Sequence, residues 1–210
     1  MRIESLATKP DRAERYLVRF SDESTMRLYR QTVEDFGLYA GLELTQEEVG
    51  KLREAAGRMS AKMRAVRIVT ASNVSKRDLE ERLIRKGENP DQAREAVEWM
   101  SGLDLVDDAR TAAQVVSQCA RKGYGIARAK QALYEKRIPK EYWEEALSDY
   151  PDQSEHILIY LRARLVDGWD SRDLKRAVDA LLRRGHNYSD IQRCLRQLDA
   201  DDRPEDTQWQ

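Results

Sequence analysis

A single tyrosine in the middle of the chain is surrounded by its most concentrated group of cations. Tyr124 lies between two glycines, which permit a tight turn between helices and let its ring project from the backbone. Guanidinium groups donate paired hydrogen bonds to carboxylate or phosphate oxygens, and a tyrosine ring can anchor such a contact. The segment therefore fits either a solvated basic face or a surface for an anion or an acidic partner. Its candidate binding residues are Arg121, Lys122, Tyr124 and Arg128, which Lys130 follows.

Two further groups of charged residues are candidates for partner contact. Asp107 and Asp108 stand just before a helical pattern, where one carboxylate would cap the helix and the other would favour its positive end. Contact with a partner is the alternative for this pair. Four arginines closer to the C-terminus extend the candidate surface: Arg162, Arg164, Arg183 and Arg184.

Residues that could catalyse a reaction are scarce. His156 and His186 are the two histidines, and both fall at helix ends, where we expect them at the surface. Cys119 and Cys194 occupy apolar helical positions, so buried thiols are expected rather than a disulfide framework. The segment 123–125 is similar to part of a phosphate loop but follows no strand. We therefore expect no catalytic residue, no metal site and no cofactor.

The elements that position these residues follow a pattern that occurs three times. In each copy a leucine precedes a basic helix end by a fixed distance, and two apolar positions of the next helix follow. The copies lie about 50 residues apart, which is typical of a small helical unit repeated in a row. They comprise Leu83, Lys86-Gly87, Ala93 and Val97; Leu133, Lys136-Arg137, Trp143 and Leu147; and Leu181, Arg184-Gly185, Ile191 and Leu195.

The N-terminal region has a different pattern. Apolar residues alternate at Val18 and Phe20, and a short polar stretch separates them from Met26 and Leu28. This alternation predicts a β-hairpin. A helix should then begin in a capping box at Thr45.

We therefore predict a mainly α protein, an elongated array of three tandem three-helix repeats with a small N-terminal β-hairpin plus helix. A unit of about 45 residues barely supports its own core, so neighbouring repeats should cover one another. Helix caps are expected from Ser75, Asn89, Asp107, Asp170 and Asn187. The predicted domains are the hairpin and helix (1–61), repeat 1 (62–104), repeat 2 (105–150), repeat 3 (151–198) and an acidic disordered tail (199–210).

Charged residues make up 36% of the 210-residue chain, yet its formal net charge is −1. The repeat bodies are mildly basic, while residues 138–153 and 198–210 are acidic. This basic excess is too small for a dedicated duplex-DNA binder and suits a protein that docks on another protein near nucleic acid. No apolar run is long enough for a membrane span, and Met1 begins no signal-peptide pattern. We expect a soluble, cytoplasmic monomer with no membrane partner.

Four short motifs, in order and correctly spaced, resemble the RecX regulatory proteins over about residues 60–198. Two positions depart from the family pattern: Thr111 stands where the family has Phe, and Arg137 stands where it has Gly. The motifs are Ser75-x-x-Asp78-Leu79-x-x-x-Leu83-x-x-Lys86-Gly87, Leu105-Val106-Asp107-Asp108, Arg121-Lys122-Gly123-Tyr124-Gly125-x-x-Arg128, and Leu133-x-x-Lys136.

The resemblance implies tandem three-helix repeats that bind the RecA recombinase in the groove of its filament on single-stranded DNA. It also implies lower ATPase, strand-exchange and co-protease activities of RecA, with no catalytic site in the regulator and only indirect or weak contact with the DNA. The candidate residues of repeats 2 and 3 would then contact the filament. A helical DNA-binding module that grips phosphate through basic helix faces is the alternative. It would bind naked DNA with a steep salt dependence.

Overall fold

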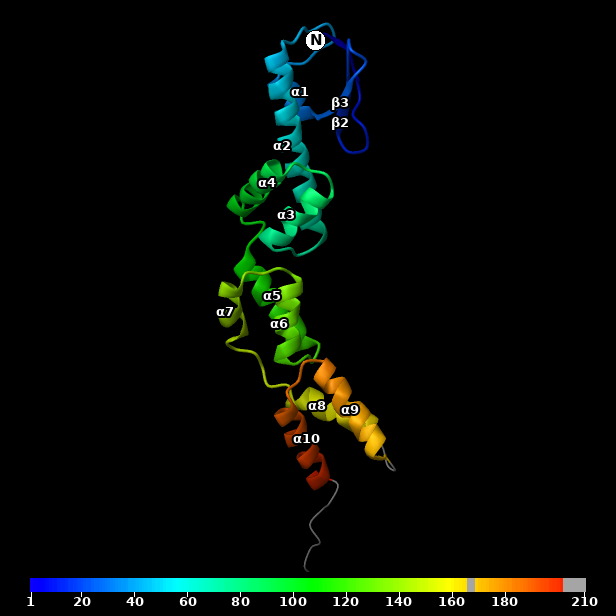
Figure 1. Ribbon diagram of the computed structural model, residues 1–210, viewed down its shortest axis with the longest axis vertical. Coiled ribbons are helices and arrows are strands. Elements are labelled where there is room, and N and C mark those ends of the chain that lie inside the picture. Colours follow the sequence, from blue (N-terminus) through cyan, green and yellow to red (C-terminus); the bar gives the residue numbers. More distant parts are fainter. Residues whose placement is uncertain (166–168, 202–210) are drawn as a thin grey trace, which may run out of the picture. The chain divides into compact units, whose positions relative to one another are not determined.

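Helices make up most of the chain in the computed structural model, which describes residues 1–165 and 169–201 (Figure 1). The confirmed mainly α architecture includes a small N-terminal sheet. The elements are β1 (Ile3–Leu6), β2 (Arg15–Phe20), β3 (Thr25–Tyr29), α1 (Arg30–Asp35), α2 (Gln46–Ala71), α3 (Lys76–Arg85), α4 (Pro90–Gly102), α5 (Asp108–Arg121), α6 (Ile126–Glu135), the 3-10 helix η1 (Lys140–Tyr142), α7 (Trp143–Leu147), α8 (Ser154–Arg164), α9 (Ser171–Arg183) and α10 (Tyr188–Asp201).

The N-terminal sheet has three antiparallel strands in the order β1-β2-β3, so the prediction of a hairpin alone was incomplete. The predicted hairpin is β2 and β3, in which Val18 pairs with Met26. The first strand adds to its free edge, where Ile3 pairs with Phe20 and is fully buried. Two strands alone would be marginal in water, and the third strand helps to cover the shared core.

One long helix serves both the sheet and the first repeat. α2 begins with the predicted capping box, in which Thr45 and Glu48 bond reciprocally. Its first half buries Val49 and Leu52 in the core of the sheet region, and its second half buries Ala61 and Ala65 with α3 and α4. The helix is continuous through residues 61 and 62, where we placed the boundary between the N-terminal region and repeat 1. The chain divides into two units, Met1–Val106 (unit 1) and Asp107–Gln210 (unit 2).

The recurring sequence pattern corresponds to a recurring turn. The helices α3, α6 and α9 each end with a left-handed residue, and the next amide N–H returns to a carbonyl at the buried leucine of the pattern. This arrangement is a Schellman motif, which satisfies the last carbonyls of a helix. The left-handed residues are Gly87 (φ 91°), Arg137 (φ 56°) and Gly185 (φ 87°), and the leucines are Leu83, Leu133 and Leu181.

Most of the expected helix starts are confirmed. Side-chain oxygens accept backbone N–H groups at every cap that the sequence indicates, namely Ser75, Asn89, Asp107, Asp170 and Asn187. The last helix of repeat 2 is shorter than its periodicity indicates, because a 3-10 turn precedes α7. The predicted disordered tail, residues 199–210, begins too early, because α10 continues to Asp201; residues 202–210, the rest of that prediction, lie outside the described residues. No helix in the described ranges has the length and apolar character that a membrane span requires.

Candidate partner-binding surface

Two arginines and two tyrosines from repeats 2 and 3 come together in unit 2. The Arg184 guanidinium lies 6.0 Å from the ring centroid of Tyr124 and 5.1 Å from that of Tyr160. The Arg164 guanidinium lies 5.6 Å from the ring centroid of Tyr160. These cation–π distances are within the range in which the ring face attracts the cation. We call these four residues the arginine–tyrosine ladder.

Sequence reasoning identified three members of this ladder and missed Tyr160. The missed residue precedes Arg164 by four positions on α8, the spacing at which helical side chains meet,. An aromatic residue four positions before an arginine was therefore a usable signal. Its contact with Arg184 depends on packing between α8 and the end of α9, which local spacing does not reveal.

Both the backbone N–H and the backbone carbonyl of Tyr124 form hydrogen bonds. It follows Gly123, whose φ of 65° turns the chain at the end of α5, and its N–H returns to the Cys119 carbonyl. Its own carbonyl oxygen accepts a hydrogen bond from the Tyr150 hydroxyl at 2.6 Å. Burial raises the pKa of Tyr150 to about 12, so this hydroxyl remains a donor,.

Direct backbone contact connects repeat 2 to repeat 3. The Gly125 N–H donates to the Arg184 carbonyl at 3.0 Å, and the Ala127 N–H donates to the Gly185 carbonyl at 3.2 Å. A Cβ atom on Gly125 would lie 2.0 Å from the Gly185 oxygen, so only glycine permits this approach,. The contact fixes Tyr124 and Arg184 relative to each other because each is next to one of these glycines.

The two histidines differ. His156 is exposed, as the sequence indicates, whereas the expectation of a surface position for His186 is wrong. His186 is buried at the same joint, with Nε2 lying 3.1 Å from the Gly123 carbonyl oxygen. Burial lowers the pKa of His186, and the positive charge of Arg184 lowers it further, which favours a neutral ring that donates to Gly123,.

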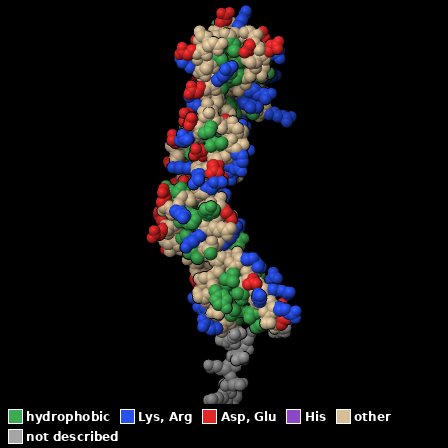
Figure 2. Space-filling model, in the orientation of Figure 1, with side chains coloured by type: hydrophobic (Ala, Val, Ile, Leu, Met, Phe, Trp, Pro, Cys, Tyr) green, Lys and Arg blue, Asp and Glu red, His purple; other side chains and the backbone are tan. Residues whose placement is uncertain are grey.

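The other predicted cations are distributed around unit 2. Arg128 forms an ion pair with Glu135 at 2.9 Å. Arg121 borders a hollow between α5 and α7, together with Ala113 and Tyr142. Three further candidate cations are exposed, and each precedes a ladder residue by one or two positions in the sequence: Lys122, Arg162 and Arg183. Figure 2 shows Lys and Arg side chains gathered over the α9 side of this unit.

The two aspartates have local partners in α5. Asp107 is the helix N-cap, and its Oδ1 accepts the Arg110 N–H at 3.1 Å. Asp108 is buried at the first helical position. Both placements match the capping interpretation of this pair, since carboxylates favour the positive end of a helix.

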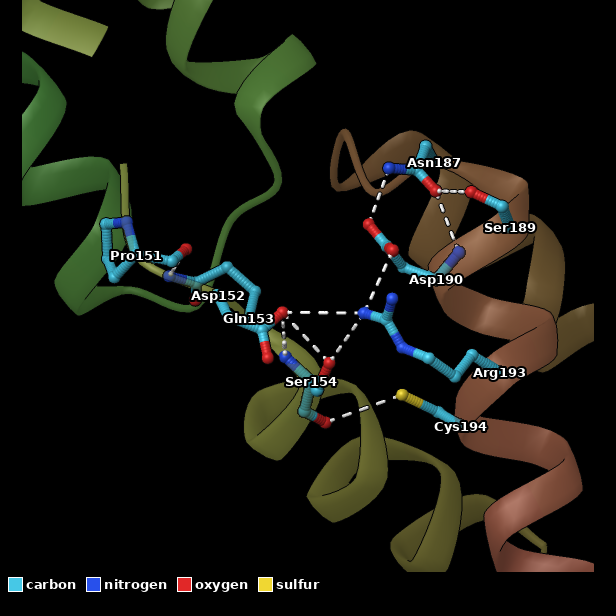
Figure 3. A network of polar contacts seen from close by, with 9 residues as sticks. All are labelled: Pro151, Asp152, Gln153, Ser154, Asn187, Ser189, Asp190, Arg193 and Cys194. Carbon is cyan, nitrogen blue, oxygen red and sulfur yellow. Dashed lines mark hydrogen bonds and ion pairs between the residues drawn. The ribbon is translucent and has the colours of Figure 1, made fainter. Parts of the chain in front are cut away.

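A polar network inside repeat 3 holds the start of α8 against α10 (Figure 3). Arg193 contacts Asp190 at 3.0 Å and Asp152 at 3.6 Å, and it donates to the Ser154 hydroxyl at 3.0 Å. The Cys194 thiol contacts the Ser154 carbonyl beside it. This network helps to position α8, which carries two members of the ladder.

Within the described residues, no three side chains among His, Cys, Asp and Glu are grouped so that they could hold a metal ion. Cys119 and Cys194 are buried and reduced, as expected, and burial raises the pKa of both thiols. The two guanidinium groups of the ladder can donate hydrogen bonds to an anion,.

The chain is similar to several known proteins. The family model for the second three-helix domain of RecX matches residues 107–147. The regulatory protein RecX of Xanthomonas campestris pv. campestris (strain B100) is 30% identical over 136 residues, which are 63% of this chain and 84% of the relative. The regulatory protein RecX of Clostridioides difficile (strain 630) is 24% identical over 203 residues, 94% of each chain.

Two solved structures share the fold. A crystal structure of a regulatory protein RecX has a TM-score of 0.65 at 17% identity and covers 93% of this chain and 98% of its own. The crystal structure of RecX from Lactobacillus salivarius has a TM-score of 0.60 at 21% identity and covers 69% of this chain and 98% of its own. Because the sequence relationship spans most of a curated relative and the repeat fold agrees, the chain belongs to the RecX family of regulatory proteins.

Proposed function

We propose that this protein regulates the RecA recombinase by binding its filament on single-stranded DNA. In this proposal it lowers the ATPase, strand-exchange and co-protease activities of RecA and performs no catalysis of its own. Membership of the RecX family supports the general role, since the relatives carry the name of regulatory proteins. The arginine–tyrosine ladder is the observation that supports the location of the contact.

The ladder has the chemistry of a binding hot spot for an acidic protein surface. The two tyrosine rings lie beside the Arg184 guanidinium, whose N–H groups can donate hydrogen bonds to carboxylates of a partner,. Within the described residues, neither Arg164 nor Arg184 is paired with a carboxylate, whereas Arg128 is. Arginine and tyrosine are enriched among residues that contribute most to protein interfaces.

The remaining candidate cations would extend this contact. Lys122, Arg162 and Arg183 are exposed, and several weak contacts on one rigid surface strengthen binding together,. Arg121 and Arg128 would contribute at the rim. Asp107 and Asp108 would act mainly by building the start of α5, which leads to Tyr124.

The test is RecA ATPase on single-stranded DNA with added wild-type or variant protein. We expect the wild type to inhibit, and the pair Arg164→Ala and Arg184→Ala to raise the inhibitory concentration by about 10-fold or more, as expected when hot-spot residues are truncated. The matched control is Lys175→Ala with Arg176→Ala, which removes the same charge from exposed positions on α9. Circular dichroism would verify that both variants are folded.

Two results would contradict the proposal. Wild-type protein without effect on RecA at equimolar ratio would reject the regulatory role. Equal losses in the ladder pair and the control pair would reject the ladder as the contact. Binding of naked DNA alone, with a steep salt dependence and no effect on RecA, would favour the DNA-binding alternative.

A further inference from the structure

Unit 1 contains a hollow that is lined mainly by cations and takes no part in the proposed contact with RecA. It lies between α2 and α3 and has a volume of about 340 Å³. Four basic side chains line it: Arg64, Arg67, Arg82 and Lys86. Ser72 and the apolar Ile68 and Ala71 complete the lining.

Two of these cations are held in place by buried carboxylates. The Arg64 Nε lies 2.6 Å from a carboxylate oxygen of Glu88, which also accepts the Ser60 hydroxyl at 3.0 Å. The Arg82 Nε donates to one carboxylate oxygen of Asp78 at 2.9 Å, its Nη2 forms an ion pair with the other at 2.9 Å, and its Nη1 donates to the Ser72 hydroxyl at 3.3 Å. Because Glu88 and Asp78 are themselves more than nine-tenths buried, they orient the two guanidinium groups before any ligand arrives.

The other two cations leave the hollow with an excess of positive charge. Arg67 donates to the Tyr29 hydroxyl at 3.1 Å, and Lys86 is exposed. In the part of the chain that the structure describes, neither is paired with a carboxylate, so four cations face two anions. Like charges around one concave space repel each other unless an anion enters from solution.

We propose that this hollow binds a phosphate group of a nucleic-acid backbone. Three guanidinium groups and one ammonium can surround a tetrahedral phosphate, whereas a flat carboxylate is satisfied by one arginine fork. The hollow is open to solvent, which suits one phosphate of a continuing strand. Exposed Lys76, Arg77 and Arg85 on α3 would follow such a strand, and Figure 2 shows basic side chains over the α3 side of the unit.

The site is independent of the proposed function. Its residues lie in unit 1, whereas the arginine–tyrosine ladder lies in unit 2. The site would recognise the charge of a phosphate and not the identity of a base, so binding should be independent of the nucleotide sequence. A phosphate contact of this kind would give the full chain a weak affinity for single strands that does not require RecA.

The experiment is fluorescence polarisation of a fluorescein-labelled 15-nucleotide oligo-dT with the full-length chain at low salt. We expect Arg67→Ala with Lys86→Ala to weaken binding by about 10-fold and to make the slope of log affinity against log salt shallower by about 1.4, the value for two lost contacts to a single strand. These two side chains are exposed, so the fold should tolerate their loss. The matched control, Arg12→Ala with Arg53→Ala, removes the same charge from exposed positions of unit 1 outside the hollow.

Competition identifies the chemistry of the ligand. Inorganic phosphate should displace the oligonucleotide from the wild type more than sodium chloride of equal ionic strength, and this difference should vanish in Arg67→Ala with Lys86→Ala. Poly-glutamate that competes as well as oligo-dT at equal charge would overturn the proposal in favour of an acidic protein. Equal weakening in the hollow and control pairs, or no wild-type binding at low salt, would also overturn it.

Discussion

At the scale of single residues, Arg137 occupies a backbone position that favours glycine. Its φ of 56° is left-handed, and the corresponding residues of the other two repeats are Gly87 and Gly185. The Schellman bonds still form, with the Ile138 N–H returning to the Leu133 carbonyl at 3.1 Å. A non-glycine residue in this region costs about 1–2 kcal/mol. Sequence comparison among the repeats exposes the substitution, and the structure shows that the turn is kept despite it.

Arg137→Gly should therefore stabilise the protein by about 0.5–1 kcal/mol, because relief of the left-handed strain exceeds the added entropy of the unfolded chain. The measurement is the midpoint of urea unfolding. Lys136→Gly is the neighbouring control, since a φ of −81° gives glycine no advantage there and a small loss is expected,. A lower midpoint for Arg137→Gly than for the wild type would mean that the arginine side chain contributes more than its backbone costs.

At the scale of elements, the sequence predicted the helices and their caps better than the contacts between repeats. Caps at Ser75 and Asp170 are local, since each side chain bonds to N–H groups two or three residues away. The role of Gly125 is not local. The sequence indicates a tight turn at that point, but the contact that requires glycine comes from Gly185, sixty residues later.

Gly125→Ala should destabilise unit 2 by about 2–3 kcal/mol, because the new methyl group would overlap the Gly185 carbonyl and force the two repeats apart,. The φ of Gly125 is −74°, so backbone strain does not contribute. Hydrogen exchange measured by mass spectrometry would locate the loss of protection. We expect it at residues 123–128 and 184–188, with unit 1 unchanged.

Gly50→Ala provides the matched control for this substitution. Gly50 lies within α2, and a Cβ atom there meets nothing within 4 Å. Alanine should stabilise that helix by about 0.5–1 kcal/mol. If Gly125→Ala were as well tolerated as Gly50→Ala, the backbone contact between the repeats would not be important for stability.

At the scale of the whole molecule, the candidate surface could be predicted only in part. Tyr124, Arg164 and Arg184 were identifiable because cations and an aromatic residue cluster in the sequence. Their assembly around Tyr160 was not, since it combines the ends of α5 and α9 with the middle of α8. The edge strand β1 escaped prediction for a related reason: its four residues carry little alternation, and its pairing depends on β2.

The two units should also respond differently to acid, because both histidines belong to unit 2. The pKa of buried His186 is lowered in the folded state, so the unfolded chain takes up a proton first as the pH falls through about 6.5,. A state that binds more protons is favoured by acid, and the stability of unit 2 should therefore be complete above that pH and decrease below it. The carboxylates whose pKa values are lowered, such as Asp170, lose their contribution only in stronger acid, as the pH falls from about 4,.

Hydrogen exchange at pH 7 and 5.5, corrected for intrinsic rates, should show protection lost in unit 2 and retained in unit 1. His186→Gln should remove this response, whereas exposed His156→Gln should keep it; an equal response in both variants would mean that acid acts through a group other than His186.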